Sequence, residues 1–275
     1  MRTMKTIALS LLVLASAGLA RAQGFQFDTS RLATVPKAEL PRERMSLRAF
    51  EAAPTLRAIG AQEKVEKSER LSRSRVAEFI GSWRVERDPL EGSLLIASTR
   101  EMVSSGGETD EMKLRAMSID LLNRIGVPQS ELGRIQVRSL MTTDAEGKEE
   151  PTRPQLLTYK TFVTREINGI PVEGHRAVVS HAPSGELHRA NLRWPALAST
   201  GHKLTTRLSV QQITERASEV LKREGEREGK VLLRWKYVPM KQSSGEVALV
   251  LAVGARIQPK PGMEPREITV PVDAQ

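Results

Sequence analysis

The histidines are the first side chains to examine for chemistry, because imidazole transfers protons and binds metals near neutral pH. They are His175, His181, His188 and His202. No two of them have the spacing of the His-Glu-x-x-His zinc site. If Ser180 pairs with Leu187, His181 and His188 lie diagonally on one sheet face. His175 then lies roughly 20 Å along the strand from His181, and no aspartate completes a site, so we predict no metal and no cofactor.

A covalent mechanism also lacks its residues. The chain has no cysteine, which excludes thiol nucleophiles, Cys-ligated zinc and disulfides. No serine sits in a Gly-x-Ser-x-Gly turn, and no glycine-rich phosphate loop follows a predicted strand. Without a nucleophile and base to pair, we predict no catalytic residues and no enzyme activity.

A cluster of polar side chains on the same hairpin is the candidate binding site. The register that joins the two histidines puts the cluster on the opposite face; its members are Arg176, Arg189, Asn191 and Arg193. Guanidinium groups bind carboxylates bidentately, which suits an acidic partner surface. The alternative is that these cations only keep a solvent-facing sheet soluble and discourage edge pairing.

Composition and charge indicate an ordinary globular protein of two small units. The 275 residues are 39% hydrophobic and only 4% aromatic, which does not favour one thick core. The formal charge of +9 falls by three without Arg2, Lys5 and Arg21, and residues 23–75 hold most of the remainder. A nucleic-acid reader concentrates cations and aromatic rings on its folded domain. We therefore predict no nucleic-acid partner.

The N-terminus has the pattern of a secretory signal. Arg2 and Lys5 precede an apolar, uncharged run from residue 6 to 19, and Ala20-Arg21-Ala22 places small residues where a signal peptidase reads. The run is too short for a stable membrane anchor. We predict a signal peptide over residues 1–22, cleaved after Ala22, and a secreted or periplasmic protein.

Residues 23–75 differ from the rest of the chain. Pro36, Pro41 and Pro54 interrupt short apolar repeats, and Arg, Glu, Lys and Ser dominate. Helices broken at this spacing are marginal alone. We predict a basic, partly disordered or short-helical arm, with ordering on a partner as the alternative.

The next segment reads as a hairpin, a helix and a meander. Residues 82–87 and 93–97 alternate around a Pro-Leu-Glu-Gly turn, and Asp110 opens a helix that Gly126 and Pro128 close. Strands are predicted over residues 133–141, 155–167, 172–181 and 186–194. Asn168-Gly169 is the clearest turn signal, because both residues accept the positive φ of a type I′ hairpin.

The same order then recurs. Ser209, with Gln212 three residues on, caps a helix that ends before Gly225. Strands are predicted over residues 230–238, 246–257 and 267–270. The sequence therefore predicts an α+β fold of tandem helix-plus-antiparallel-sheet units, over residues 76–198 and 203–275, preceded by a flexible arm.

One segment resembles a known family. It runs from Tyr159 to Trp194 and contains Asn168, Gly169, Ile170, Pro171, Val172, Glu173 and Gly174, then a Ser-Gly turn and a second apolar strand. This pattern is similar to the PepSY and fungalysin/thermolysin-type propeptide domains of secreted metalloproteases. The resemblance implies PepSY/cystatin-like units without the protease, since the 81 residues after Trp194 hold no zinc-binding pair.

The resemblance implies an exported, non-enzymatic binding module that inhibits a secreted metalloprotease or assists its folding, with another acidic-surfaced protein as a further possible partner. The alternative is an exported structural protein, or one that binds a small ligand or peptide, with no protease partner. The residues alone leave both open.

Overall fold

The computed structural model describes residues 19–22, 24–32, 39–44, 50–61, 65–101, 109–142, 155–204, 206, 208–242, 246–258 and 265–272, with the backbone alone at 19–22 and 52. The chain divides into two compact units, each built from segments distant in sequence. The first comprises Met1–Val35, Arg207–Arg234 and Val253–Val272; the second comprises Pro36–Thr206, Trp235–Ala252 and Asp273–Gln275.

The second unit contains a run of eight antiparallel strands. Their spatial order is β4 (Lys67–Arg70), β5 (Val76–Ile80), β6 (Trp83–Asp88), β7 (Ser93–Ser98), β11 (Leu187–Arg193), β10 (Ile170–His181), β9 (Gln155–Ile167) and β8 (Leu132–Thr142). The β7–β11 pairing joins the early hairpin to the later meander. Side chains alternate between the two faces of this sheet.

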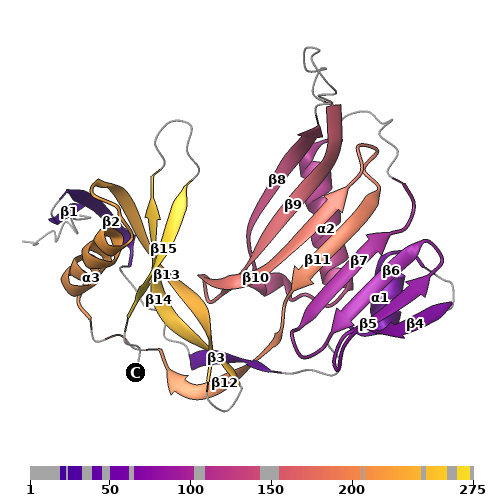
Figure 1. Ribbon diagram of the computed structural model, residues 1–275, viewed down its shortest axis with the longest axis horizontal. Helices are drawn as coiled ribbons and strands as arrows, with labels where there is room; N and C mark the ends of the chain where they lie inside the picture. The colour runs from indigo at the N-terminus through magenta and orange to yellow at the C-terminus, as the bar shows by residue number, and fades with distance from the viewer. Residues whose placement is uncertain are drawn as a thin grey trace, which may run out of the picture. The chain divides into compact units, whose positions relative to one another are not determined.

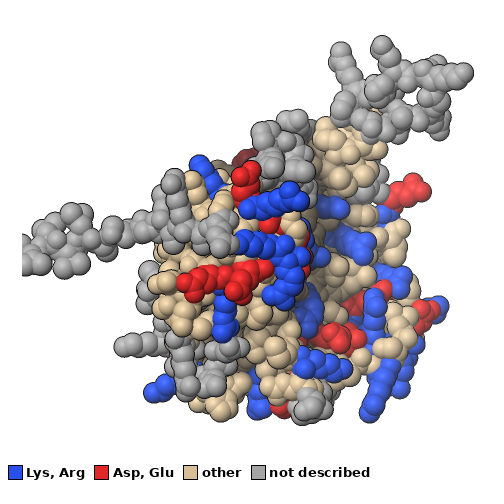
Figure 2. Space-filling view, turned by 60° about the vertical axis from the view of Figure 1, so that its left-hand side comes forward, with Lys and Arg blue, Asp and Glu red and all other residues tan. Residues whose placement is uncertain are grey.

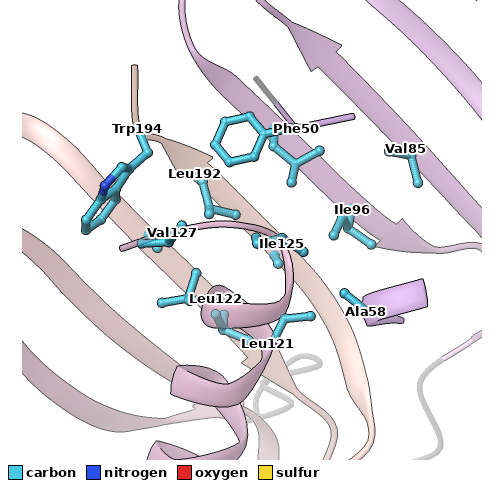
Figure 3. Packing of buried hydrophobic residues seen from close by; sticks show 14 of the residues in the cluster. Phe50, Ala58, Val85, Ile96, Leu121, Leu122, Ile125, Val127, Leu192 and Trp194 are labelled. Carbon is cyan, nitrogen blue, oxygen red and sulfur yellow. The ribbon is translucent and has the colours of Figure 1, made fainter. Parts of the chain in front are cut away.

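Two helices cover one face of these strands, α1 (Ala52–Ala58) and α2 (Glu111–Arg124), as Figure 1 shows. Asp110 caps α2, because its side chain accepts a hydrogen bond from the Met112 amide. Leu121 and Leu122 of α2 pack with strand residues such as Ile96 and Leu192 (Figure 3). A short 3-10 turn, η1 (Gln129–Glu131), leads from α2 into β8. The core therefore lies on the helix side, and the opposite face of these strands carries polar side chains.

Two further strands belong to the second unit, β3 (Glu39–Arg44) and β12 (Ala196–Lys203), which pair antiparallel. The strands β13 (Gly229–Lys241) and β14 (Val247–Ile257) contribute to both units. In the second unit Tyr237 of β13 pairs parallel with Val172 of β10.

The first unit contains helix α3 (Val210–Arg223) and the strands β1 (Leu19–Ala22), β2 (Phe25–Arg31) and β15 (Arg266–Pro271), with parts of β13 and β14. Ser209 and Gln212 form the predicted capping box of α3. β2 pairs antiparallel with β1 and parallel with Gly229–Arg234 of β13. Phe25 and Phe27 of β2 are buried.

The predicted fold class is wrong. The described residues form mainly mixed β-sheet, with fifteen strands and three α-helices, rather than tandem helix-plus-antiparallel-sheet units. The local hairpins and helices were placed close to their observed bounds. The error lies in strand partners far apart in sequence, such as the parallel pair of β2 and β13, which no local turn specifies.

The expected arm over residues 23–75 also differs from the structure. Its described residues contain β2, β3, α1 and β4, and they supply buried side chains such as Phe27, Phe50 and Thr55. Short apolar repeats that cannot stand alone fold here because strands and helices elsewhere in the chain cover them. Within the described ranges, no helix is both long and apolar enough to span a bilayer.

Candidate functional site

The strands that carry His181 and His188 pair in a different register from the predicted one. Val179 pairs with Ala190 instead of His188, and a bulge between Ser180 and His181 shifts the pairing to His181 with Leu187. The predicted register is therefore wrong by two residues, although His181 and His188 still lie on the helix side, where both line one cavity. Within the described residues, no group of three or more potential ligands is placed to hold a metal.

His175 lies in a buried polar network on the second unit. Its Nε2 lies 2.8 Å from Glu43 Oε1, and its Nδ1 lies 3.3 Å from Nη1 of Arg165. A guanidinium can only donate, so Nδ1 accepts, and the proton on Nε2 is donated to Glu43. This tautomer is neutral. Burial lowers the pKa of His175, and the charges of Arg165 and Arg193 lower it further. The hydrogen bond and charge of Glu43 act in the opposite direction, but the pKa is lowered overall.

Arg165 is the most buried charge of this network. Its side chain is 2% exposed, its Nη2 pairs with Glu131 at 2.7 Å, and its Nη1 donates to the Pro195 carbonyl at 2.6 Å. The guanidinium lies over the ring of Trp194, whose Nε1 donates to Glu131 at 2.9 Å. Burial opposes the ionisation of Glu43, but the hydrogen bond from His175 and the charge and hydrogen bonds of Arg193 lower its pKa overall. These contacts satisfy most of the buried polar atoms of the network, with Arg165 Nε as the exception, and are consistent with a structural role.

The predicted turn and its following residues have defined roles in the backbone. Asn168 (φ 53°) and Gly169 (φ 76°) both have positive φ, which a type I′ hairpin requires. Ile170, Pro171 and Val172 begin β10. Gly174 (φ 75°) lies in the bulge where the β9–β10 register shifts, and the Glu173 carboxylate pairs with Lys236 at 2.6 Å. The segment is thus a turn followed by a bulge.

The predicted polar cluster does lie on one face of the β10–β11 hairpin. Arg176 pairs with Arg193, Asn191 with Val178, and Arg189 with Ser180. Their chain neighbours Ala177, Val179, Ala190 and Leu192 are buried under the helices, so the cluster points to the uncovered face. Arg176, Arg189 and Asn191 are exposed. Arg193 differs, because its Nη2 donates to both carboxylate oxygens of Glu43, at 3.0 and 2.9 Å.

The structure adds two cations from neighbouring strands to this cluster. Lys160 of β9 pairs with Ser180, and Arg138 of β8 pairs with Lys160. The three cations Arg138, Lys160 and Arg189 therefore form one row across four strands. We call the uncovered face of these strands the cationic face; it comprises Arg138, Lys160, Arg176, Arg189 and Arg193 around Gln136, Phe162, Val178 and Asn191.

The cationic face is unusual in its charge. Its cross-strand rows contain no Asp or Glu, and within the described chain Arg138, Lys160, Arg176 and Arg189 form no ion pair. On the side of the molecule drawn in Figure 2, basic and acidic side chains are intermingled. Four strands of an exposed sheet therefore present excess positive charge around a half-buried apolar centre, Phe162 and Val178.

The sequence reasoning missed Arg138 and Lys160 because their place depends on the register of β8 and β9. That register is not set by the Asn-Gly turn alone, since bulges interrupt both the β8–β9 and β9–β10 ladders. The alternation of side chains along the strand could have placed Lys160. Lys160, Phe162 and Thr164 have the opposite parity to the core residue Val163, so they lie on the face away from the core.

Two cavities of the second unit are lined by residues of α2. The larger, of 960 Å³, is also lined by Trp83, His181 and His188. Burial lowers the pKa of His181 to about 4, so its imidazole is neutral there. The smaller, of 420 Å³, is bordered by Phe50, Trp194 and Arg165. Both are within the size range of small-ligand sites.

Comparisons with known proteins assign no family. No family model matches the chain. No curated protein matches it either. Among solved structures, an uncharacterized protein from Eubacterium rectale is 13% identical with a TM-score of 0.48, covering 85% of this chain and 81% of its own. The YpeB C-terminal domain of Bacillus megaterium is 8% identical with a TM-score of 0.42, covering 85% and 98%. We draw no functional argument from similarity at this level.

Proposed function

We propose that this chain is an exported, non-enzymatic binding module whose cationic face docks an acidic surface of a protein partner. The observation that carries the proposal is the charge of that face: four Lys and Arg on four adjacent strands form no ion pair within the described residues, beside Arg193, which pairs with Glu43. A surface of one sign attracts the opposite sign and speeds encounter with it.

The arrangement of residues on the cationic face is better suited to binding a protein than to binding a nucleic acid. Phe162 and Val178 lie half-buried at its centre, and the cations lie on either side. Protein interfaces combine an apolar centre with a charged rim in which arginine is enriched. Arg138 lies over the Phe162 ring at 5.7 Å, which leaves that ring less free to stack on a nucleic-acid base.

The first partner to test is a thermolysin-type metalloprotease, because the segment from Asn168 to Gly174 resembles the propeptides of such enzymes. In that role the module inhibits the protease or assists its folding after export. The alternative, an exported structural or ligand-binding protein with no protease partner, is supported by the two cavities beside α2.

The test compares two charge variants of equal size. The double variant Arg176→Gln and Arg189→Gln removes two exposed cations from the cationic face. Its control, Lys113→Gln and Arg115→Gln, removes two exposed cations from α2, which covers the opposite face. Arg193 is left intact, because its removal leaves the largely buried carboxylate of Glu43 without that partner, so that a loss of stability could be mistaken for a loss of binding.

Binding to the protease and inhibition of its activity are measured at low and moderate salt. We expect the wild type and the α2 variant to bind alike, and the cationic-face variant to bind about tenfold or more weakly, since each exposed pair contributes up to about 1 kcal/mol. Added salt should narrow the difference. Equal binding by all three proteins would contradict the role of the cationic face in docking. The absence of saturable binding at micromolar concentration would contradict the proposal that the partner is a protease.

A further inference from the structure

The strand β8 has one open edge beside the cationic face. Within the described residues β8 pairs with β9 alone, so along eleven residues its other edge has no strand partner. The sheet's other end is β4, which has only four residues. Natural sheets protect their edges by short strands, charges or cover, and a long open edge is a template for another strand.

The two sides of β8 have different chemistry. Arg138 faces the cationic side, and Arg134, four residues earlier, shares its parity and is exposed. Ile135 and Val137 have the other parity and are half-buried toward the helices. Leu140, two residues after Arg138, lies on the same side as Arg138 and is 40% exposed. The edge thus offers cations on one side and the half-buried Ile135 and Val137 on the other.

A second copy of β8 is a poor neighbour for this edge. Antiparallel pairing of two copies about Gln136 puts Arg134 of each copy opposite Arg138 of the other. Like charges directly opposite each other destabilise a strand pair. The same two arginines attract carboxylates, so charge favours an acidic strand over a second copy paired in this register.

We propose that the acidic partner docks by adding one extended segment to the open edge of β8. This inference rests on the proposed function and specifies its mode of binding and the sequence of the bound segment. Residues beside Arg134 and Arg138 are acidic, and the alternating residues beside Ile135 and Val137 are apolar, because side chains of neighbouring strands share a face. Backbone hydrogen bonds provide affinity, and the alternation of acidic and apolar residues provides specificity.

The probe is a blocked peptide that alternates valine and glutamate over seven residues. Two control peptides carry the same charges, one N-methylated at every valine and the other at every glutamate. Amides of alternate residues point to the same edge of a strand, so each control blocks one edge of the peptide and leaves the other edge able to bond.

We expect the parent peptide to bind, one methylated peptide to bind at least about tenfold more weakly, and the other to bind within about twofold of the parent. On binding, hydrogen exchange of β8 amides should slow while that of β4 amides stays unchanged. Equal binding by all three peptides, or no binding by the parent at millimolar concentration, overturns edge addition. Either result concerns only the edge of β8. The role of the cationic face is tested separately, by the binding of the two charge variants to the protease.

Discussion

Two buried histidines are neutral mainly because burial lowers the pKa of each, and His175 also lies beside a cation. Nδ1 of His175 faces the donor groups of Arg165, so a second proton there would meet a guanidinium. His181 has no such neighbour, and burial alone lowers its pKa to about 4. In the unfolded chain both return to the ordinary histidine pKa near 6.5. The native state therefore binds fewer protons than the unfolded state in mildly acidic solution.

This difference makes stability fall as the pH falls from about 6.5 toward 4. The unfolded state takes up protons first, which favours unfolding, and the His181 contribution amounts to about 3 kcal/mol across that window. We expect His181→Gln to flatten the dependence of the unfolding free energy on pH, measured by urea titration at pH 7 and pH 4.5. His175 shifts in the same direction, so part of the slope should persist. If the unfolding free energy of the variant depended on pH as steeply as that of the wild type, His181 would take up its proton at the same pH in the native and unfolded states.

The residues of the candidate site were predictable only in part. Arg176, Arg189, Asn191 and Arg193 were placed on one face correctly, because a register error of two residues preserves the parity of every side chain. The partner of Arg193 was not predictable. Glu43 lies 150 residues earlier in the chain, and nothing in its local sequence marks it as the centre of a buried network.

Helices and hairpins followed their local signals closely. The caps Asp110 and Ser209 begin α2 and α3 as predicted, and Gly126 and Gly225 follow their ends. These signals act within one helical turn, so they survive any error in the tertiary arrangement. Bulges, in contrast to helix caps, were not predictable from local signals. The register of the β10–β11 pair shifts between Ser180 and His181, and the alternation of polar and apolar residues in the sequence does not mark this position.

The turn at Asn168 and Gly169 offers a test of backbone strain by itself. A Cβ at Gly169 meets no atom within 4 Å, so a substitution there changes the backbone preference and little else. We expect Gly169→Val to lower the unfolding free energy by about 1–2 kcal/mol, because a β-branched residue disfavours φ of +76°. Gly169→Asn is the control, since asparagine tolerates this region. Equal urea midpoints for the two variants would rule out strain as the basis of the turn.

At the scale of the whole molecule, each unit is assembled from distant segments. The first unit joins residues near the N-terminus to strands from the last fifty residues through the parallel pair of β2 and β13. The sequence showed the strands of β13 and β14 clearly. It could not show that a segment read as an arm would become their neighbour, because a parallel pairing has no connecting turn to mark it.

The segment at residues 25–31 should therefore matter for stability. Phe27 is fully buried and pairs in register with Val231 of β13. We expect Phe27→Ala to cost about 3–5 kcal/mol through lost burial and the cavity it leaves. Thermal melting followed by far-UV circular dichroism measures this, with Gln26→Ala, on the alternate side of the strand, as the control. Equal melting of the two variants would restore the interpretation of this segment as a peripheral arm.

The pairing of β1 with β2 sets an order of events for a chain that is processed after Ala22. Ala22 pairs with Phe25, so the bond to be cut directly follows the last residue of β1. Proteases act on the opened backbone, so cleavage is expected before β1 and β2 pair. The partner of β2 on its other side, Gly229–Arg234, is made about two hundred residues later, which takes roughly ten seconds or more of synthesis. If the chain is exported as it is made and cut after Ala22, the cut precedes the synthesis of β13, and the sheet then forms with β2 at its edge.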